Sequence, residues 1–215
     1  PLLLSAPSSS WAATYTFIVA GLGGEPEYEQ RFQTHADEIA AIASGLADSG
    51  EDVVKLSGAQ ATREAIRTTL QTLAERVKPE DVVTIVLIGH GTYDGEEYRF
   101  NIPGPDVTGS ELQRLLSQLR AREQLIVNTT SASGATVDKW AQPGRVLISA
   151  TKSGGERTAT RFAQYWAEAL KGANADANKD EVVTASEAFE YASRQVTAAF
   201  KADVALATEH ARLEG

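Results

Sequence analysis

Two apolar stretches decide the fold of this chain: residues 82–91, VVTIVLIGHG, and residues 125–134, LIVNTTSASG. Each is an apolar run that stops abruptly at small or polar residues, a pattern typical of strands buried on both faces of a parallel sheet. Ligands of such sheets bind just beyond the carboxyl ends of the strands. We therefore expect His90 and Ser131, each one step past its run, to project into the same crevice.

Helices and strands alternate through the rest of the sequence. This alternation predicts a three-layer α/β/α sandwich with a mostly parallel central sheet. In the first predicted helix, His35 and Asp37 lie off the apolar stripe and are expected to face solvent. Residues 92–105, rich in Gly, Pro and charge, are expected to form a hairpin or flap beside the crevice. The other predicted strands are residues 14–20, 52–56, 123–128 and 146–150, and the predicted helices are residues 29–48, 62–78, 108–119, 158–170 and 184–201.

Length and charge bound the organisation and the partners of the chain. At 215 residues it fits one domain, residues 14–202, with an N-terminal tail of residues 1–13 and a C-terminal tail of residues 203–215. The net charge of −9 is spread along the chain, which argues against nucleic acid or an anionic membrane as the main partner. No apolar run is long enough to span a bilayer. The absence of cysteine excludes disulfides, thiolate metal sites and a cysteine nucleophile.

The first twelve residues, PLLLSAPSSSWA, allow two interpretations. They are a disordered tail, or they are the end of a secretory signal in which Ser10, Trp11 and Ala12 form the cleavage site. The second interpretation predicts export, the first leaves the protein in the cytoplasm, and both stay open.

His90 and Ser131 have the residue types and the neighbours of a hydrolytic site. A glycine on each side of His90 leaves its imidazole uncovered and lets a substrate backbone come close. Ser131 lies in a run of small residues, 130–134, which by itself also fits a polar turn whose serine caps a helix. The Gly-His-Gly motif one strand earlier favours the functional interpretation.

The order of these motifs resembles that of the caspase and legumain-like peptidases, including their bacterial relatives. In that family an apolar strand ending in His-Gly is followed by a helix and a second strand ending in Cys-x-Ser-Gly. Ser131-Ala132-Ser133-Gly134 matches this turn with serine in place of cysteine. The segments RVLISATKSGGERTATRF and ADANKDEVVTASEAFEYASRQV also resemble later parts of the family. The resemblance covers most of residues 14–196 and implies a caspase-like fold.

The resemblance also implies a role for each matching residue. His90 would be the catalytic base or acid, and Ser131 would occupy the place of the nucleophile. The backbone N–H groups of Gly91 and Ser131 would form the oxyanion hole. The implied ligand is an extended peptide or a protein substrate.

Two departures from the family concern specificity. The family usually has an acidic residue two positions before the nucleophile, where this chain has Thr129. Caspases carry an arginine just after the first strand to hold an acidic P1 side chain, but residues 21–24 contain none and Arg31 already lies in the predicted helix. Specificity for aspartate is therefore not predicted. Four residues after the fifth strand are candidates for the substrate pocket, and their opposite charges allow either sign of side chain: Lys152, Ser153, Glu156 and Arg157.

The serine predicts weak or absent hydrolysis. A cysteine thiol has a pKa of about 8.5 and is partly ionised at neutral pH, whereas a serine hydroxyl needs a base within about 3 Å that a third group orients. Asp94 is the candidate for that third group nearest to His90 in the sequence. The serine is an engineered inactivation, the mark of a natural pseudo-peptidase, or a natural serine variant, and the absence of cysteine favours a natural replacement. The alternative function is an inactive module that binds a peptide or a protein.

Calcium is the one metal for which the sequence holds a pattern. Four residues fall at EF-hand loop positions one, three, five and twelve: Asp176, Asn178, Asp180 and Glu187. Glu181 occupies position six, where the sharp turn favours glycine. Residues 184–187, TASE, are also a capping box, which explains the last glutamate without a metal. The favoured interpretation is a turn that caps a helix, with no metal and no other cofactor.

Overall fold

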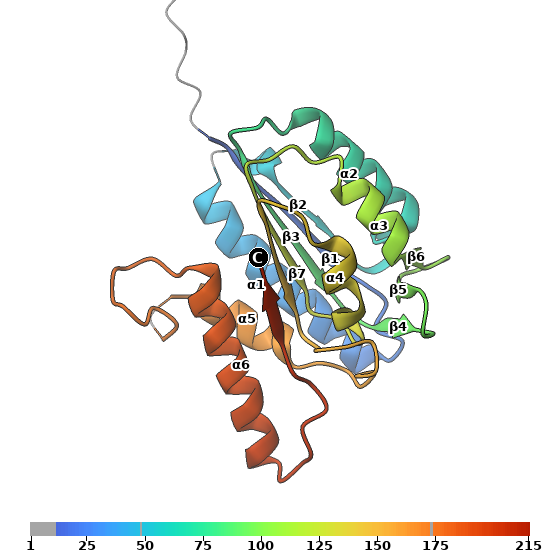
Figure 1. The fold of residues 1–215 in the computed structure, drawn as a ribbon, viewed down its shortest axis with the longest axis vertical. Coiled ribbons are helices and arrows are strands. Elements are labelled where there is room, and N and C mark those ends of the chain that lie inside the picture. The colour runs from blue at the N-terminus through green and yellow to red at the C-terminus, as the bar shows by residue number, and fades with distance from the viewer. Residues whose placement is uncertain (1–11, 48, 173) are drawn as a thin grey trace, which may run out of the picture.

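The structure is a computed structural model that describes residues 12–47, 49–172 and 174–215. Its main sheet consists of six strands: β1 (Thr14–Ala20), β2 (Val53–Leu56), β3 (Val82–Ile88), β7 (Glu123–Asn128), β8 (Arg145–Ser149) and β9 (Arg212–Glu214). They lie in the order β2-β1-β3-β7-β8-β9, and only β9 runs antiparallel to its neighbour (Figure 1). The predicted mostly parallel central sheet is confirmed.

Helices cover both faces of this sheet, as the apolar strands predicted. Successive residues of a strand point to opposite faces, so Phe17 and Ile85 pack in one apolar cluster and Ile18 and Val86 in the other. The cover of the first face is α2 (Arg63–Arg76), α3 (Gly109–Leu116) and α4 (Val137–Trp140), and that of the second is α1 (Pro26–Leu46), α5 (Phe162–Leu170) and α6 (Ala185–Ala202) (Figure 1). The three-layer α/β/α sandwich is therefore confirmed as well.

The segment after β3 folds into a second, small sheet. Its antiparallel strands are β4 (Gly91–Tyr93), β5 (Tyr98–Phe100) and β6 (Val107–Thr108). The sequence predicted a hairpin or flap here, and the structure adds a third strand. Tyr98 and Phe100 are fully buried in the same cluster as Phe17, so the small sheet is anchored to the core.

Three helices begin where the sequence predicted, each after a capping threonine, and a fourth begins later than predicted. Thr62, Thr108 and Thr184 each accept a hydrogen bond from the backbone N–H three residues further on. The helix expected from residue 158 starts at Phe162, because the Glu209 carboxylate accepts hydrogen bonds from the N–H groups of Arg161 and Phe162. A cap supplied from the other end of the chain has no local sequence signal.

The C-terminal segment also differs from the sequence-based expectation. Residues 203–215 were expected to be a tail, but β9 pairs with β8 and Glu209 is buried. A three-residue strand in a polar segment carries too short a pattern to be predicted. The two interpretations of the N-terminal residues concern residues 1–11 above all, which lie outside the described residues.

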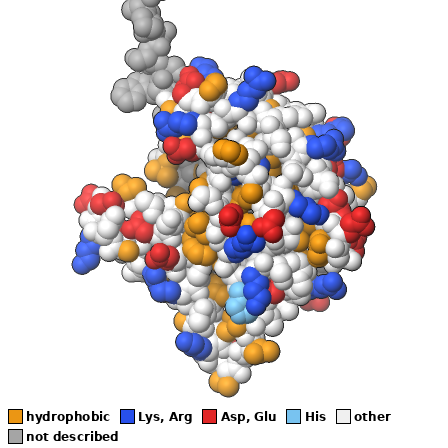
Figure 2. All heavy atoms as spheres, viewed as in Figure 1, with side chains coloured by type: hydrophobic (Ala, Val, Ile, Leu, Met, Phe, Trp, Pro, Cys, Tyr) orange, Lys and Arg blue, Asp and Glu red, His pale blue; other side chains and the backbone are white. Residues whose placement is uncertain are grey.

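Two further observations concern the surface and possible membrane contact. Within the described ranges, no helix combines the length and apolarity that a bilayer crossing needs. On the face in Figure 2, acidic and basic side chains are intermixed rather than separated by sign.

Candidate functional site

His90 and Ser131 follow neighbouring strands at matching positions. In the parallel pair of β3 and β7, Leu87 is paired with Asn128, and the two candidates each follow three residues later. The two turns touch, because a Cβ added at Gly91 would lie 2.5 Å from the Ser131 carbonyl oxygen. Only a glycine fits between them. The structure thus brings the predicted pair to one edge of the sheet.

His90 is partly exposed and is held by helix α1. Its ring packs edge-on against two aromatic rings, with centroids 5.0 Å from Tyr28 and 5.1 Å from Phe32. Burial lowers the pKa of the imidazole, and a hydrogen bond to the backbone of Gly23 opposes this shift. The Gly23 N–H already donates to Glu29, and only an acceptor favours the protonated ring, so the partner is the Gly23 carbonyl. The ring is therefore oriented, and it is neutral at neutral pH.

Asp94 is engaged in its own turn rather than with the histidine. Its carboxylate accepts hydrogen bonds from the N–H groups of Glu96 and Glu97 and from the Arg99 side chain. These bonds hold the pKa of Asp94 well below its usual range. The sequence offered Asp94 as the group that orients His90. In the structure the Gly23 carbonyl has this position instead, and no side-chain pattern could indicate a backbone group.

Ser131 is buried, and its two hydrogen-bond donors, the hydroxyl and the backbone N–H, are unused. The residue is 1% exposed, and within the described part of the chain its hydroxyl has no hydrogen-bond partner and its backbone N–H meets no acceptor. The neighbouring Thr130 hydroxyl, by contrast, lies 2.6 Å from the Tyr98 hydroxyl and donates to the Asn128 side chain at 2.8 Å. A buried polar group without a partner destabilises the fold by about 1–3 kcal/mol. Ser131 therefore stands apart from the bonded turn around it.

A loop of residues 151–157, which we call the roof loop, closes over this turn. The Ala132 N–H donates to the Glu156 carbonyl at 2.7 Å. Further along the loop, a Cβ added at Gly154 would lie 2.2 Å from the ring of Tyr93 in β4. The roof loop thus reaches from the serine turn to the small sheet. The crevice that the sequence predicted is consequently closed at the serine.

The four predicted pocket residues all lie in the roof loop. Lys152, Ser153 and Arg157 are exposed, and Glu156 is partly buried. The Glu156 carboxylate accepts a hydrogen bond from the Lys152 N–H and contacts His210. None of the four lines the cavity found beside His90.

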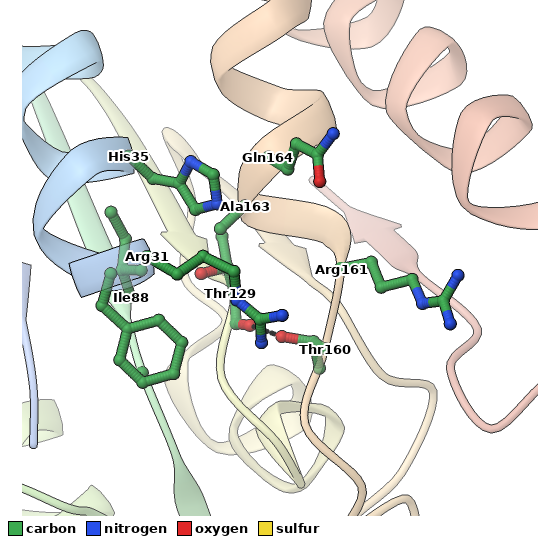
Figure 3. A pocket seen from close by; sticks show the side chains of 10 residues that line it. Arg31, His35, Ile88, Thr129, Thr160, Arg161, Ala163 and Gln164 are labelled. Atoms are coloured by element: carbon green, nitrogen blue, oxygen red, sulfur yellow. Dashed lines mark hydrogen bonds between the residues drawn. The ribbon is translucent and has the colours of Figure 1, made fainter. Parts of the chain in front are cut away.

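That cavity, with a volume of about 20 Å³, lies between α1 and α5 at the carboxyl ends of β3 and β7 (Figure 3). Arg31 reaches across it from α1 toward Thr129 and Thr160, whereas Arg161 turns away (Figure 3) and pairs with Asp203. The Thr160 hydroxyl donates to the Thr129 carbonyl, which ties the start of α5 to the end of β7. The cavity is thus a small, basic recess.

Arg31 and His35, one helical turn apart, are the residues that the sequence-based reasoning missed. The guanidinium of Arg31 lies 4.5 Å from the centroid of the Tyr28 ring, and no carboxylate within the described ranges pairs with it. The side chain of His35 is 12% exposed, and burial lowers its pKa, so the expectation of a solvated histidine was wrong. Asp37 is exposed as expected. The helical spacing of Tyr28, Arg31 and His35 was the available signal.

The calcium pattern is a turn folded by its own hydrogen bonds. The Asp176 carboxylate accepts bonds from three backbone N–H groups of the loop, and the Asn178 side chain donates to Asp180. Glu187 completes the capping box of α6, and Glu181 adopts a φ of +68° where glycine was expected. Within the described ranges, no group of three or more His, Asp or Glu residues is arranged to hold a metal ion.

Comparisons with known proteins support the fold alone. No protein-family model and no curated protein matches the chain. Among solved structures, protein GSU0716 from Geobacter sulfurreducens is similar, with a TM-score of 0.64 and 12% sequence identity over 94% of this chain and 92% of that chain. The two chains therefore share the α/β architecture over nearly their full lengths.

Proposed function

We propose that this protein is a caspase/legumain-like peptidase-fold domain that binds an extended peptide at His90 and Ser131, with weak or absent hydrolysis. One observation carries the proposal: the buried Ser131 hydroxyl has no partner, on a turn that touches the glycine after His90. Buried hydroxyls are normally hydrogen-bonded, as that of Thr130 is. An unused hydroxyl on a turn that touches the Gly-His-Gly turn suits a group that meets the carbonyl of a bound peptide.

Two backbone N–H groups support an oxyanion hole at this point. The Asn101 N–H donates to the His90 carbonyl, one step before the pair of Gly91 and Phe100. Because bonded and non-bonded pairs alternate along an antiparallel ladder, the Gly91 N–H points away from β5. Together with the unused N–H of Ser131, it provides two donors for the oxygen of a tetrahedral intermediate.

In this proposal His90 takes the proton of the Ser131 hydroxyl as that oxygen attacks the peptide carbonyl, and then gives the proton to the leaving amine. The lowered pKa supports this role, since a general base must be unprotonated at the working pH. Turnover is slow or absent for two reasons. The hydroxyl makes no hydrogen bond to the imidazole, and the roof loop closes over it.

The position of Arg31 favours a bound peptide that carries an acidic side chain. It lines the cavity beside Phe32, the residue whose ring touches His90. An arginine in a partly buried recess favours a carboxylate, which it binds through two parallel hydrogen bonds. The recess has room for one water-sized group, so a peptide carboxylate would enter it only after the Arg31 side chain moves.

Ser131→Cys is the variant that tests the enzyme, because the chain contains no other thiol. We expect it to cleave peptides after Asp or Glu faster than matched peptides with Asn or Gln. Adding His90→Ala should abolish cleavage, and adding Arg31→Gln should remove the preference for acidic residues. A folded Ser131→Cys protein that neither cleaves nor binds any member of a broad peptide library would overturn the proposal.

An inactive pseudo-peptidase that holds a peptide or protein is the second candidate, favoured by the closed surroundings of Ser131. A fluorophosphonate probe separates the two candidates. Covalent labelling of the wild type that is lost in Ser131→Ala supports the enzyme. Peptide binding without labelling supports the binding module.

A further inference from the structure

We infer that residues 203–215 form a strap that locks the roof loop over Ser131, so that release of the strap at His210 opens the site. The inference adds a closing device to the proposed function. It rests on that function only in treating Ser131 as the reacting residue, and its test needs no peptidase activity.

The lock consists of His210 and Glu156. The His210 Nδ1 atom lies 2.5 Å from one carboxylate oxygen of Glu156, and the His210 backbone N–H donates to the other at 3.2 Å. The carboxylate is largely shielded, with the Glu156 side chain 12% exposed. The carbonyl of the same residue accepts the N–H of Ala132, which follows Ser131. Glu156 therefore joins the strap on one side to the serine turn on the other.

Contacts on both sides of His210 hold the strap in place. Before it, the buried Glu209 carboxylate accepts two backbone N–H groups at the start of α5. After it, Arg212 donates to Asp138 of α4, and β9 pairs with β8. Because these anchors flank it in the chain, position 210 is fixed against the roof loop.

The strap leaves α6 through a strained hinge. The Ala205 N–H donates to the Phe200 carbonyl and the Val204 N–H to the Lys201 carbonyl, a helix end that places Val204 at a φ of +52°. This left-handed conformation favours glycine and is unfavourable for a β-branched residue. The side chains of Val204 and Leu206 are exposed, so the closed position of the strap depends on the anchors further along.

The test measures the access of a small thiol reagent, iodoacetamide, to position 131. Ser131→Cys carries the only thiol, and we expect it to react at least tenfold more slowly than Ser153→Cys on the exposed part of the roof loop. Adding His210→Ala or Glu156→Ala to Ser131→Cys should raise its rate about tenfold. The two changes together should raise it no further than Glu156→Ala alone, since that change already removes the carboxylate that the His210 ring contacts.

A matched control removes an ion pair elsewhere. Arg194→Ala breaks an exposed pair with Glu190 on α6 and should leave the labelling rate unchanged. Hydrogen exchange gives a second readout: the Ala132 amide should lose protection in His210→Ala, while the amides of β3 keep theirs.

Two outcomes overturn the inference. One is a folded Ser131→Cys/His210→Ala protein that is labelled no faster than Ser131→Cys. The other is a Ser131→Cys protein that is labelled as fast as Ser153→Cys. Both rates are independent of peptide cleavage, so a failure of the proposed function would leave them interpretable.

Discussion

The turns after β3 and β7 touch each other but are built in different ways. The first carries a partly exposed imidazole, held by two aromatic rings of α1 and one backbone carbonyl. The second carries a buried hydroxyl, unbonded among the described residues, in a turn that is bonded to the small sheet through Thr130 and to the roof loop through Ala132. The histidine side is thus ready to accept a proton, while the serine side has to open. Access to Ser131, rather than the state of His90, is expected to limit any chemistry here.

A second contrast lies within the β7 turn. Thr130 and Ser131 are adjacent and equally buried, yet the hydroxyl of the first is bonded to its neighbours and that of the second to none within the described residues. The fold therefore depends on one of these hydroxyls and is weakened by the other. Four predictions test these contrasts.

Gly91→Ala should have the largest effect, because it separates the two turns. The added Cβ would meet the Ser131 carbonyl at 2.5 Å and the Tyr98 ring at 2.7 Å, so we expect a loss of about 3 kcal/mol in the free energy of unfolding. Urea denaturation measures it. Gly45→Ala is the matched control, since Gly45 lies in α1 with open space around it and should gain about 0.5–1 kcal/mol. Equal effects of the two changes would contradict the contact between the turns.

Thr130→Val should lower the free energy of unfolding by about 2 kcal/mol, because it leaves the buried Tyr98 hydroxyl and the Asn128 side chain short of a partner. The measurement is again urea denaturation. Adding Tyr98→Phe removes both partners of one bond, so the double variant should lose less than the sum of the single losses. Strictly additive losses would show that this bond contributes little.

Ser131→Ala should have a smaller effect of the opposite sign. It removes a buried hydroxyl that has no partner, so we expect the free energy of unfolding to rise by up to about 1 kcal/mol. Thermal denaturation beside Thr130→Val tests the contrast directly. A clear loss of stability in Ser131→Ala would reveal a partner for this hydroxyl and weaken its assignment as a reacting group.

The smallest expected effect is a shift in the pKa of His90. Burial lowers its pKa below the ordinary value of 6.5, so the NMR titration midpoint of its ring should lie below that value. The folded protein then binds the proton less readily than the unfolded chain. The contribution of His90 to stability is therefore complete above about pH 6.5 and is lost as the pH falls through the folded pKa. Phe32→Ala should expose the ring and raise the midpoint, and an unchanged midpoint would argue that burial is not the cause.

Several elements of this protein follow from local sequence. β1 and β7 have the predicted bounds, and the helices capped by Thr62 and Thr184 begin where predicted. The matching positions of His90 and Ser131 follow from two apolar runs that end at polar residues. These features depend on side-chain periodicity and on hydrogen bonds between residues close in the chain, so the sequence by itself determined them.

Other features were decided only by the tertiary structure. The start of α5 depends on Glu209, the orientation of His90 on the Gly23 carbonyl, and the closure over Ser131 on the contact between Glu156 and His210. Each joins residues far apart in the sequence, and one uses a backbone atom that every residue type possesses. Such contacts form only when packing brings the segments together, which is why no local pattern in the chain could specify them.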